Sequence, residues 1–157
     1  MIKINHQLLE ALTERAMQSD RKRMNYNFHS GPPDPMQRML NAIEPGSYIR
    51  PHKHEKPDKR EVFFVLRGRI LILEFDDHGH ITDHILLDPS AGNYAAEVPE
   101  RTWHSMIALE PGSVAYEVKD GPWDPADDKV FASWAPPEES EEVKPYMDKI
   151  LEKLKLI

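Results

Sequence analysis

The sequence predicts a single all-β domain, an antiparallel sandwich or barrel, with one short helix at each end. The chain has 157 residues, of which 14 are Pro and 7 are Gly, and Pro is poorly tolerated inside helices. Turn-forming clusters recur at short intervals between residues 31 and 122, and the segments between them are rich in Val, Ile, Phe and Tyr. This pattern is typical of consecutive short strands, and the length suits one domain spanning residues 1–157.

The predicted domain has three parts: a helical segment over 1–23, a β-barrel over 24–135 and a C-terminal helix within 136–157. Apolar residues at helical spacing predict both helices. In the first helix, over residues 5–17, these are Leu8, Leu9, Leu12 and Ala16. In the last they are Val143, Met147, Ile150, Leu151 and Leu154. Glu residues precede the last helix and Lys residues end it, as the helix dipole favours.

Composition excludes several classes of function. The net charge of −7 opposes binding to nucleic acid. The chain has no Cys, so disulfides, thiolate metal sites and a Cys nucleophile are excluded. The longest apolar runs, 62–66 and 70–73, are far shorter than a membrane span of roughly 20 residues. The first residues carry no secretion signal, so we expect a cytoplasmic protein without a membrane partner.

Three imidazoles and a carboxylate predict a metal site. His52 and His54 lie in a predicted strand over 47–54, on one face and roughly 6.6 Å apart along the backbone. Glu61 opens an apolar strand, where it must lie exposed at the strand end or pair with a cation, since burial of an unpaired carboxylate costs several kcal/mol. His104 begins another strand. Together the four side chains form a candidate ligand set for one ion.

Polar residues near this set are candidates for ligand binding. Asn25, Asn27 and His29 alternate with apolar residues and share one strand face. That face would form a hydrogen-bonding wall for a polyhydroxylated ligand if it points into the barrel; alternatively it faces solvent or a subunit interface. Tyr48 and Arg50 share the face of His52. Arg50 would bind a carboxylate or phosphate, or form a structural salt bridge. His29 or Tyr48 would supply a base.

The order of these residues resembles the two sequence motifs of the cupin superfamily. The first motif is matched by Gly46, His52, His54, Glu61 and Gly68, and the second by Gly92, Pro99 and His104. The resemblance implies a double-stranded β-helix, or jelly roll, with the metal bound inside one end of the barrel by His52, His54, Glu61 and His104.

The sequence departs from the cupin motifs at three points. The spacer between His54 and Glu61 is longer than usual and leaves Asp58 as a competing ligand. Glu61 is favoured because it keeps the usual six-residue distance to Gly68. Arg101 stands where the second motif has Gly, and Ala108 where it has Asn.

A narrower resemblance covers most of the chain. Segments 23–29, 34–46, 50–54 and 119–136 resemble the WbuC family of cupin-fold metalloproteins. That family is associated with bacterial O-antigen and related polysaccharide gene clusters, so the resemblance implies a role in polysaccharide biosynthesis.

The predicted site supports three hypotheses about function. The first is a metal-dependent isomerase or epimerase that acts on a sugar or organic acid, with one divalent ion (Fe, Mn, Ni, Co or Zn) as Lewis acid. The second is an Fe(II)-dependent, dioxygenase-like cupin. The third is a non-catalytic sugar-binding module. Cupins often pair through sheet edges, so we expect a homodimer.

Overall fold

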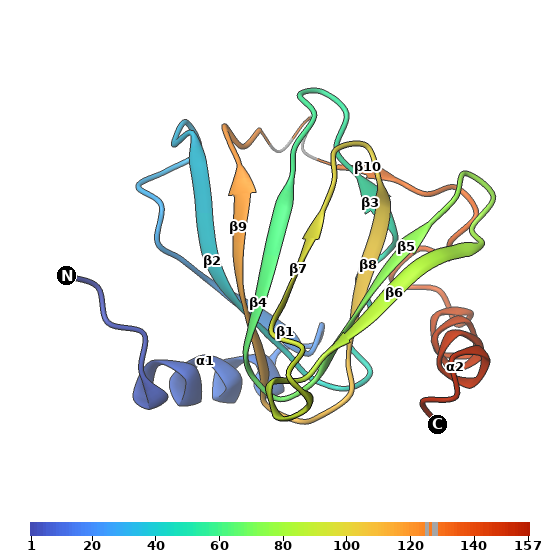
Figure 1. The fold of residues 1–157 in the computed structure, drawn as a ribbon, viewed down its shortest axis with the longest axis horizontal. Coiled ribbons are helices and arrows are strands. Elements are labelled where there is room, and N and C mark those ends of the chain that lie inside the picture. The colour runs from blue at the N-terminus through green and yellow to red at the C-terminus, as the bar shows by residue number, and fades with distance from the viewer. Residues whose placement is uncertain (125, 127–128) are drawn as a thin grey trace.

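The computed structural model describes residues 1–124, 126 and 129–157. Its strands form two five-stranded sheets that face each other (Figure 1), and every pairing described is antiparallel. The first sheet contains, in order, β1 (Arg23–Asn27), β2 (Met36–Ile43), β9 (Ser113–Asp120), β4 (Glu61–Arg67) and β7 (Ala95–Val98). The second contains β10 (Val130–Phe131), β3 (His52–Lys53), β8 (Trp103–Ala108), β5 (Ile70–Phe75) and β6 (Ile81–Leu87). This jelly roll confirms the predicted fold class.

The core lies between the two sheets, with buried residues from both. Alternation along β4 shows how the sequence builds it: Phe63 and Val65 are buried, whereas Phe64 and Leu66 are about 40% exposed. Ile72 and Met106 contribute from the opposite sheet.

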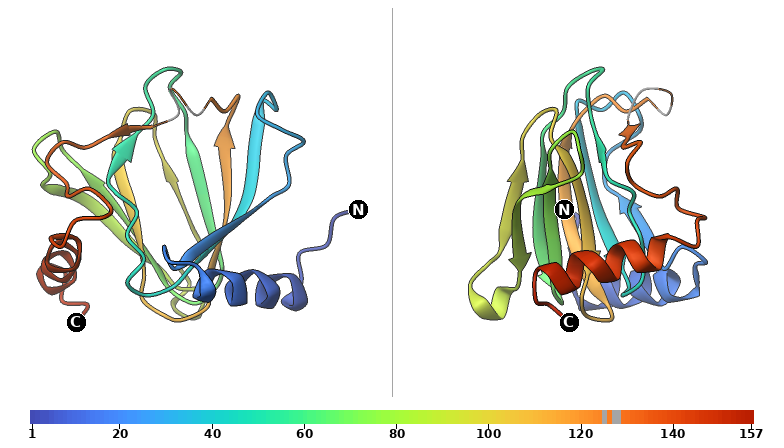
Figure 2. Two further views of the ribbon diagram at one scale, coloured as in Figure 1. Left: turned by 180° about the vertical axis from the view of Figure 1, so that it is seen from behind. Right: turned by 90° about the vertical axis from the view of Figure 1, so that its right-hand side faces the viewer.

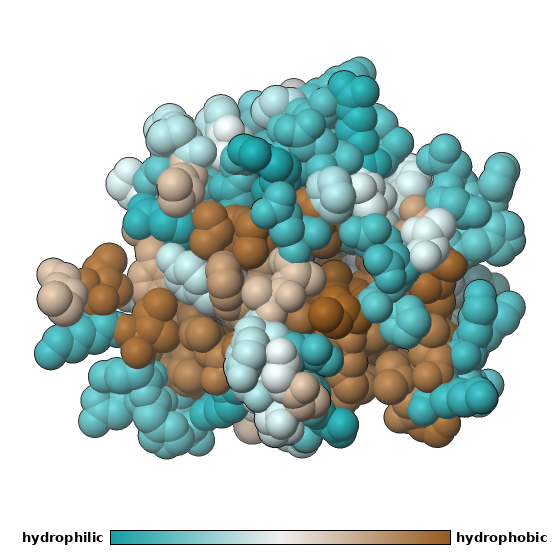
Figure 3. Space-filling model, viewed as in Figure 1, coloured by the Kyte–Doolittle hydropathy of each residue, from teal (hydrophilic) through white to brown (hydrophobic). Residues whose placement is uncertain are grey.

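Figure 3 shows hydrophobic side chains on the surface as well. The predicted homodimer stays a prediction.

A helix packs against the outer side of each sheet (Figure 2). The first, α1 (His6–Gln18), buries Leu9, Leu12 and Ala16 against β2 and β9. The second, α2 (Val143–Lys153), buries Met147 and Ile150 against β5 and β8. Both terminal helices are therefore confirmed. Neither helix of the described residues has the length and apolar character that a membrane crossing requires.

The N-cap of α1 makes a testable contribution to stability. Asn5 accepts a hydrogen bond through Oδ1 from the backbone N–H of Leu8 at 3.1 Å. We expect Asn5→Ala to lower the free energy of unfolding by about 1 kcal/mol, because the cap satisfies an N–H that the helix leaves unpaired. Chemical denaturation measures the loss. Asn5→Ser keeps a capping oxygen and is the control; equal stability of the Ala and Ser variants would contradict the prediction.

The predicted strand over 47–54 is wrong in extent. Only His52 and Lys53 are in a strand, β3, and the rest of the segment is irregular. Pro51 has no N–H to donate to a sheet ladder. His52 nevertheless pairs directly with His104 of β8, so the short strand suffices to bring two predicted metal ligands together.

A tight turn joins β4 to β5 across the two sheets. Gly68 has a φ of +74°, and a Cβ atom there would come within 2.3 Å of Ser113 Oγ. Only glycine combines that backbone conformation with so close an approach. The turn therefore explains why the motif that contains His52, His54 and Glu61 ends in a glycine.

Candidate metal centre

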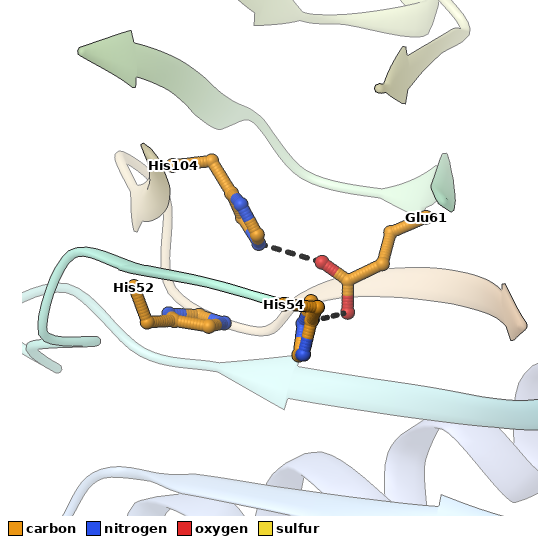
Figure 4. Close-up of side chains that lie close together, drawn as sticks. All are labelled: His52, His54, Glu61 and His104. Atoms are coloured by element: carbon orange, nitrogen blue, oxygen red, sulfur yellow. Dashed lines mark ion pairs between the residues drawn. The ribbon is translucent and has the colours of Figure 1, made fainter. Parts of the chain in front are cut away.

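The four predicted ligands lie close together and come from both sheets (Figure 4). His52 is in β3, His54 follows it, His104 is in β8, and Glu61 opens β4 of the other sheet. One candidate ligand atom from each residue lies within 4.8 Å of all the others, and all four residues are buried. The structure therefore brings together a group of side chains that could hold a metal ion.

Backbone carbonyls set the tautomers of two of the histidines. His52 Nδ1 lies 3.0 Å from the carbonyl oxygen of Arg50, and His104 Nδ1 lies 2.9 Å from that of Thr102. A carbonyl can only accept, so Nδ1 carries the proton in each ring. The lone pair on Nε2 is then available to a cation, as in metal-binding histidines whose other nitrogen is held by a carbonyl.

The contact between His104 and Glu61 is the strongest evidence for a cation. His104 Nε2 and Glu61 Oε2 lie 2.6 Å apart, yet both atoms are buried and neither has a hydrogen-bond partner. With the His104 proton on Nδ1, two lone pairs face each other across this short distance. The arrangement is repulsive unless a cation lies between the two atoms, either a bound metal ion or a proton on His104 Nε2.

The pKa values of the ligands suit metal binding. Burial, together with the nearby charges of Lys129 and His104, holds the pKa of His52 well below its ordinary value. Burial alone would raise the pKa of Glu61, but His104, His54 and Lys119 outweigh it and lower this pKa well below its ordinary value. At neutral pH the site therefore offers a neutral imidazole from His52 and an ionised carboxylate, which are the forms that metals bind.

The donor set fits a divalent transition metal. Three neutral imidazoles and one carboxylate would leave a divalent ion with a net charge of about +1, and a five- or six-coordinate ion would keep one or two positions for water or a ligand. Such nitrogen and oxygen donors suit Fe, Mn, Ni, Co and Zn alike.

Asp58, the competing ligand, points elsewhere. Arg101 binds Asp58 Oδ2 through Nε at 2.8 Å and Nη2 at 2.7 Å. Arg101 itself has a φ of +61°, a left-handed conformation that favours glycine, which explains why the cupin motif has Gly at this position. The structure groups Glu61, and not Asp58, with the three imidazoles.

This placement predicts that Asp58 contributes little to metal binding. We expect Asp58→Asn to change the affinity for a divalent ion less than about fivefold, because Asp58 pairs with Arg101 outside the ligand group and such a surface ion pair is worth at most about 1 kcal/mol. Titration of the metal-free variant with Mn²⁺, Ni²⁺ or Zn²⁺ measures this affinity. A loss as large as that of a Glu61→Gln variant would show that Asp58 is a ligand.

A cavity of about 500 Å³ opens over the metal centre. Besides His52, Glu61 and His104, the polar and aromatic groups that matter for a ligand are Asn25, His29, Asn41, Glu117, Lys119 and Phe131. They come from both sheets, so a molecule in the cavity would contact the open side of a bound ion and the polar walls together.

Two of the three polar residues predicted to share one strand face line this cavity. Asn25 and His29 line it, and Asn25 donates through Nδ2 to Asn27 Oδ1 at 2.7 Å. Asn27 is exposed, so it supports Asn25 from outside. His29 Nδ1 lies 3.1 Å from both the backbone N and O of Arg38, which holds the ring in place.

Tyr48 and Arg50 do not line the cavity. The Tyr48 hydroxyl donates to the carbonyl of Pro136 at 3.0 Å within the apolar cluster beneath α2. Arg50 donates through Nη2 to the carbonyl of Ala132 at 2.6 Å and lies 5.7 Å from the ring centre of Phe131. A role of either residue in binding a ligand stays a prediction.

Sequence reasoning missed two buried charged residues of β9. Glu117 and Lys119 are 7% and 5% exposed and line the cavity, and Lys119 Nζ lies 3.8 Å from Glu61 Oε1. The available signal was a pair of charges at alternate positions of an otherwise apolar strand. That signal is of the same kind as the carboxylate that opens β4.

The Glu117 carboxyl group is restrained by a hydrogen bond, and its pKa is raised. Asn41 donates through Nδ2 to Glu117 Oε2 at 2.6 Å. Burial and the negative charge of Glu61 raise the pKa of Glu117 to about 7, although Lys119 and Lys129 act in the opposite direction. A carboxyl group with such a pKa exchanges its proton near neutral pH.

Comparison with known proteins supports the fold. A family model described as "Domain of unknown function (DUF6016)" matches residues 4–87. No curated protein matches the sequence. Similar solved structures include KdgF from Halomonas sp., which is 20% identical with a TM-score of 0.50 and aligns over 66% of this chain and 82% of KdgF.

Two further structures align over most of this chain. The capsular polysaccharide assembling protein CapF from Staphylococcus aureus is 24% identical with a TM-score of 0.56; the alignment covers 72% of this chain but only 32% of CapF. L-ribose isomerase from Geodermatophilus obscurus is 14% identical with a TM-score of 0.56, and the alignment covers 72% of this chain and 70% of the isomerase. These likenesses confirm the cupin fold. The narrower resemblance to the WbuC family stays a prediction.

Proposed function

This chain belongs to the family described as "Domain of unknown function (DUF6016)". That description names no activity, so we propose a function from the site itself. We propose that the protein is a metal-dependent cupin that acts on a sugar or a sugar-derived acid. The observation that supports a bound metal ion is the contact between His104 Nε2 and Glu61 Oε2. These atoms lie 2.6 Å apart, and both are buried without hydrogen-bond partners. We propose that His52, His54, Glu61 and His104 are the ligands.

The cavity supports the proposed class of ligand. Its volume of about 500 Å³ lies within the range of small-molecule sites. Asn25, His29 and Asn41 line it and offer donors and acceptors that suit the hydroxyl groups of a sugar. Lys119 and Lys129 also line it and add positive charge that favours an acidic group.

Two comparisons are consistent with a ligand of this class. One structural neighbour is described as a capsular polysaccharide assembling protein and another as an L-ribose isomerase. Together with the segments that resemble the WbuC family, they support a role in bacterial polysaccharide metabolism. We therefore propose that the protein acts in the metabolism of a bacterial polysaccharide.

The bound ion and the protein side chains would have different roles in the reaction. A bound divalent ion would act as a Lewis acid on a carbonyl or a pair of hydroxyl groups. The protein would bind the ligand through Asn25, His29 and Asn41 and would keep bulk water away from the buried metal centre. Low local polarity then strengthens every charge interaction within the site.

Metal analysis and ligand titration test this function. We expect protein purified without chelator, or reloaded with Fe²⁺, Mn²⁺, Ni²⁺ or Zn²⁺, to hold about one ion per chain by elemental analysis. Calorimetric titration with a panel of aldoses, ketoses and uronic acids should detect binding that disappears after EDTA treatment. Failure to bind any of these ions, or sugar binding that survives metal removal, would overturn the proposal. Iron-dependent oxygen consumption would favour the dioxygenase-like hypothesis instead.

A further inference from the structure

One carboxyl group in the cavity is left without a role in metal binding. Glu117 lies on the inner side of β9, two residues before Lys119. In the pairing of β4 with β9, Glu61 is opposite Lys119 and Phe63 is opposite Glu117. Glu117 is therefore one repeat further along the barrel wall than Glu61, roughly 7 Å along the strand. Glu61 and Glu117 both line the cavity, so a small ligand there would contact the metal centre and the Glu117 carboxyl group together.

The surroundings of Glu117 orient the carboxyl group. Asn41, on the neighbouring strand β2, donates to Glu117 Oε2 at 2.6 Å and also lines the cavity. This charge-assisted hydrogen bond restrains the side chain. Phe63, opposite on β4, is buried in the core beside it. The carboxyl group is thus held at the boundary between the apolar core and the cavity.

We propose that Glu117 is the proton-transfer group of the site, and that the substrate is a sugar with a hydroxyl group next to a carbonyl. The inference rests on the function proposed above and deepens it, because it names the reaction as isomerisation or epimerisation through an enediol.

The step balances with one carboxyl group. Glu117 takes the proton from the carbon next to the carbonyl, and the electron pair of that C–H bond becomes the C=C bond of an enediol while the carbonyl oxygen gains negative charge. For the isomeric sugar, Glu117 returns the proton to the former carbonyl carbon, and the proton of the neighbouring hydroxyl group moves to the former carbonyl oxygen as that hydroxyl group becomes the new carbonyl. For the epimer, a second donor returns a proton to the opposite face of the same carbon, and the carbonyl re-forms in its original place. No electron is gained or lost overall.

Other basic groups in the cavity are already engaged. Glu61 belongs to the metal centre, and Lys119 lies 3.8 Å from it. His29, one of the two bases that the sequence suggested, has Nδ1 against the backbone of Arg38. The groups that face Glu117 are Asn41, Glu61, Lys119 and Lys129, and burial raises the pKa of its carboxyl group. A carboxyl group in the cavity, held in place by Asn41, can both accept and return a proton.

Hydrogen exchange in D₂O tests the inference. Metal-loaded protein is incubated with each of a panel of aldopentoses, aldohexoses and ketoses, and loss of the C–H signal next to the carbonyl is followed by ¹H NMR. We expect exchange with at least one sugar. Glu117→Gln should reduce it at least about 100-fold, because general acid–base catalysis contributes 10² or more, without loss of the ion.

Matched variants separate a chemical role from a structural one. Glu97→Gln changes an exposed carboxylate on β7 and should leave exchange unchanged. Glu117→Asp keeps the carboxylate at a shorter reach and should retain slow exchange with normal metal content. If the Gln variant does not fold, by circular dichroism and thermal unfolding, the Asp variant decides: exchange at the full rate overturns the inference.

The outcomes distinguish the two proposals. Absence of metal binding, or of metal-dependent sugar binding, overturns the proposed function. Sugar binding with normal metal content but no exchange overturns only the role of Glu117, and so does exchange that survives in Glu117→Gln.

Discussion

His104→Ala is expected to lower the affinity for a divalent ion at least about 100-fold. Loss of a group that merely orients a metal ligand costs 10- to 100-fold, and His104 is placed as a ligand itself, with Nε2 at 2.6 Å from Glu61. Titration of metal-free protein with Mn²⁺, Ni²⁺ or Zn²⁺ measures the affinity. The stabilisation that wild-type protein gains from the ion, about 2.7 kcal/mol at a concentration 100 times the Kd, should fall to about 0.4 kcal/mol or less at the same concentration.

His84→Ala provides the matched control, because His84 is exposed on β6. Its metal affinity and its stabilisation by metal should equal those of wild-type protein. The metal-free His104→Ala protein must also show a cooperative unfolding transition, which separates loss of a ligand from loss of the fold. Retention of wild-type affinity in His104→Ala would mean that the four side chains do not bind an ion together.

The sequence predicted that these four side chains lie together because part of the signal is local. His52 and His54 are two residues apart, so strand alternation predicts that they share one face, and in the structure both join the group although β3 ends at Lys53. Joining them to Glu61 and His104 required the cupin motif, since a chain of alternating strands does not show which strands face each other. The choice of Glu61 over Asp58 followed from its distance to Gly68, and the left-handed φ of Gly68 gives that distance its physical basis.

The second set of site residues was predicted less well for a related reason. Tyr48 and Arg50 were placed beside His52 by extending one strand over residues 47–54, but the strand contains only His52 and Lys53. Irregular backbone before it does not follow the alternation of a strand. Tyr48 turns toward the apolar cluster beneath α2 and Arg50 toward the carbonyl of Ala132.

Glu117 could have been found by the argument that was applied to Glu61. A carboxylate at a buried position of an apolar strand needs a partner or an unusual pKa. Its partner, Asn41, is 76 residues away in the sequence, so the pairing itself depends on the strand order of the sheet. Sequence patterning could therefore have marked Glu117 as unusual without showing what it contacts.

The raised pKa of Glu117 should make metal-free protein less stable as the pH rises. The pKa lies at about 7 in the folded chain against an ordinary 4.5, so between these values the folded state binds a proton that the unfolded state has lost. The contribution of Glu117 to the free energy of unfolding is complete below pH 4.5, falls between pH 4.5 and pH 7, and is lost at higher pH. The difference of about 2.5 in pKa corresponds to about 3 kcal/mol.

Comparison with Glu117→Gln isolates this effect, because other titrating groups cancel between the two proteins. We expect urea denaturation in EDTA to show that the Gln variant gains about 3 kcal/mol relative to wild type between pH 4 and pH 8.5. Glu97→Gln should show no such gain, since Glu97 is exposed. A bound divalent ion would neutralise the charge of Glu61 that helps to raise this pKa, so metal should shrink the gain. A difference between wild type and Glu117→Gln that is the same at both pH values would show that Glu117 titrates as an ordinary carboxylate.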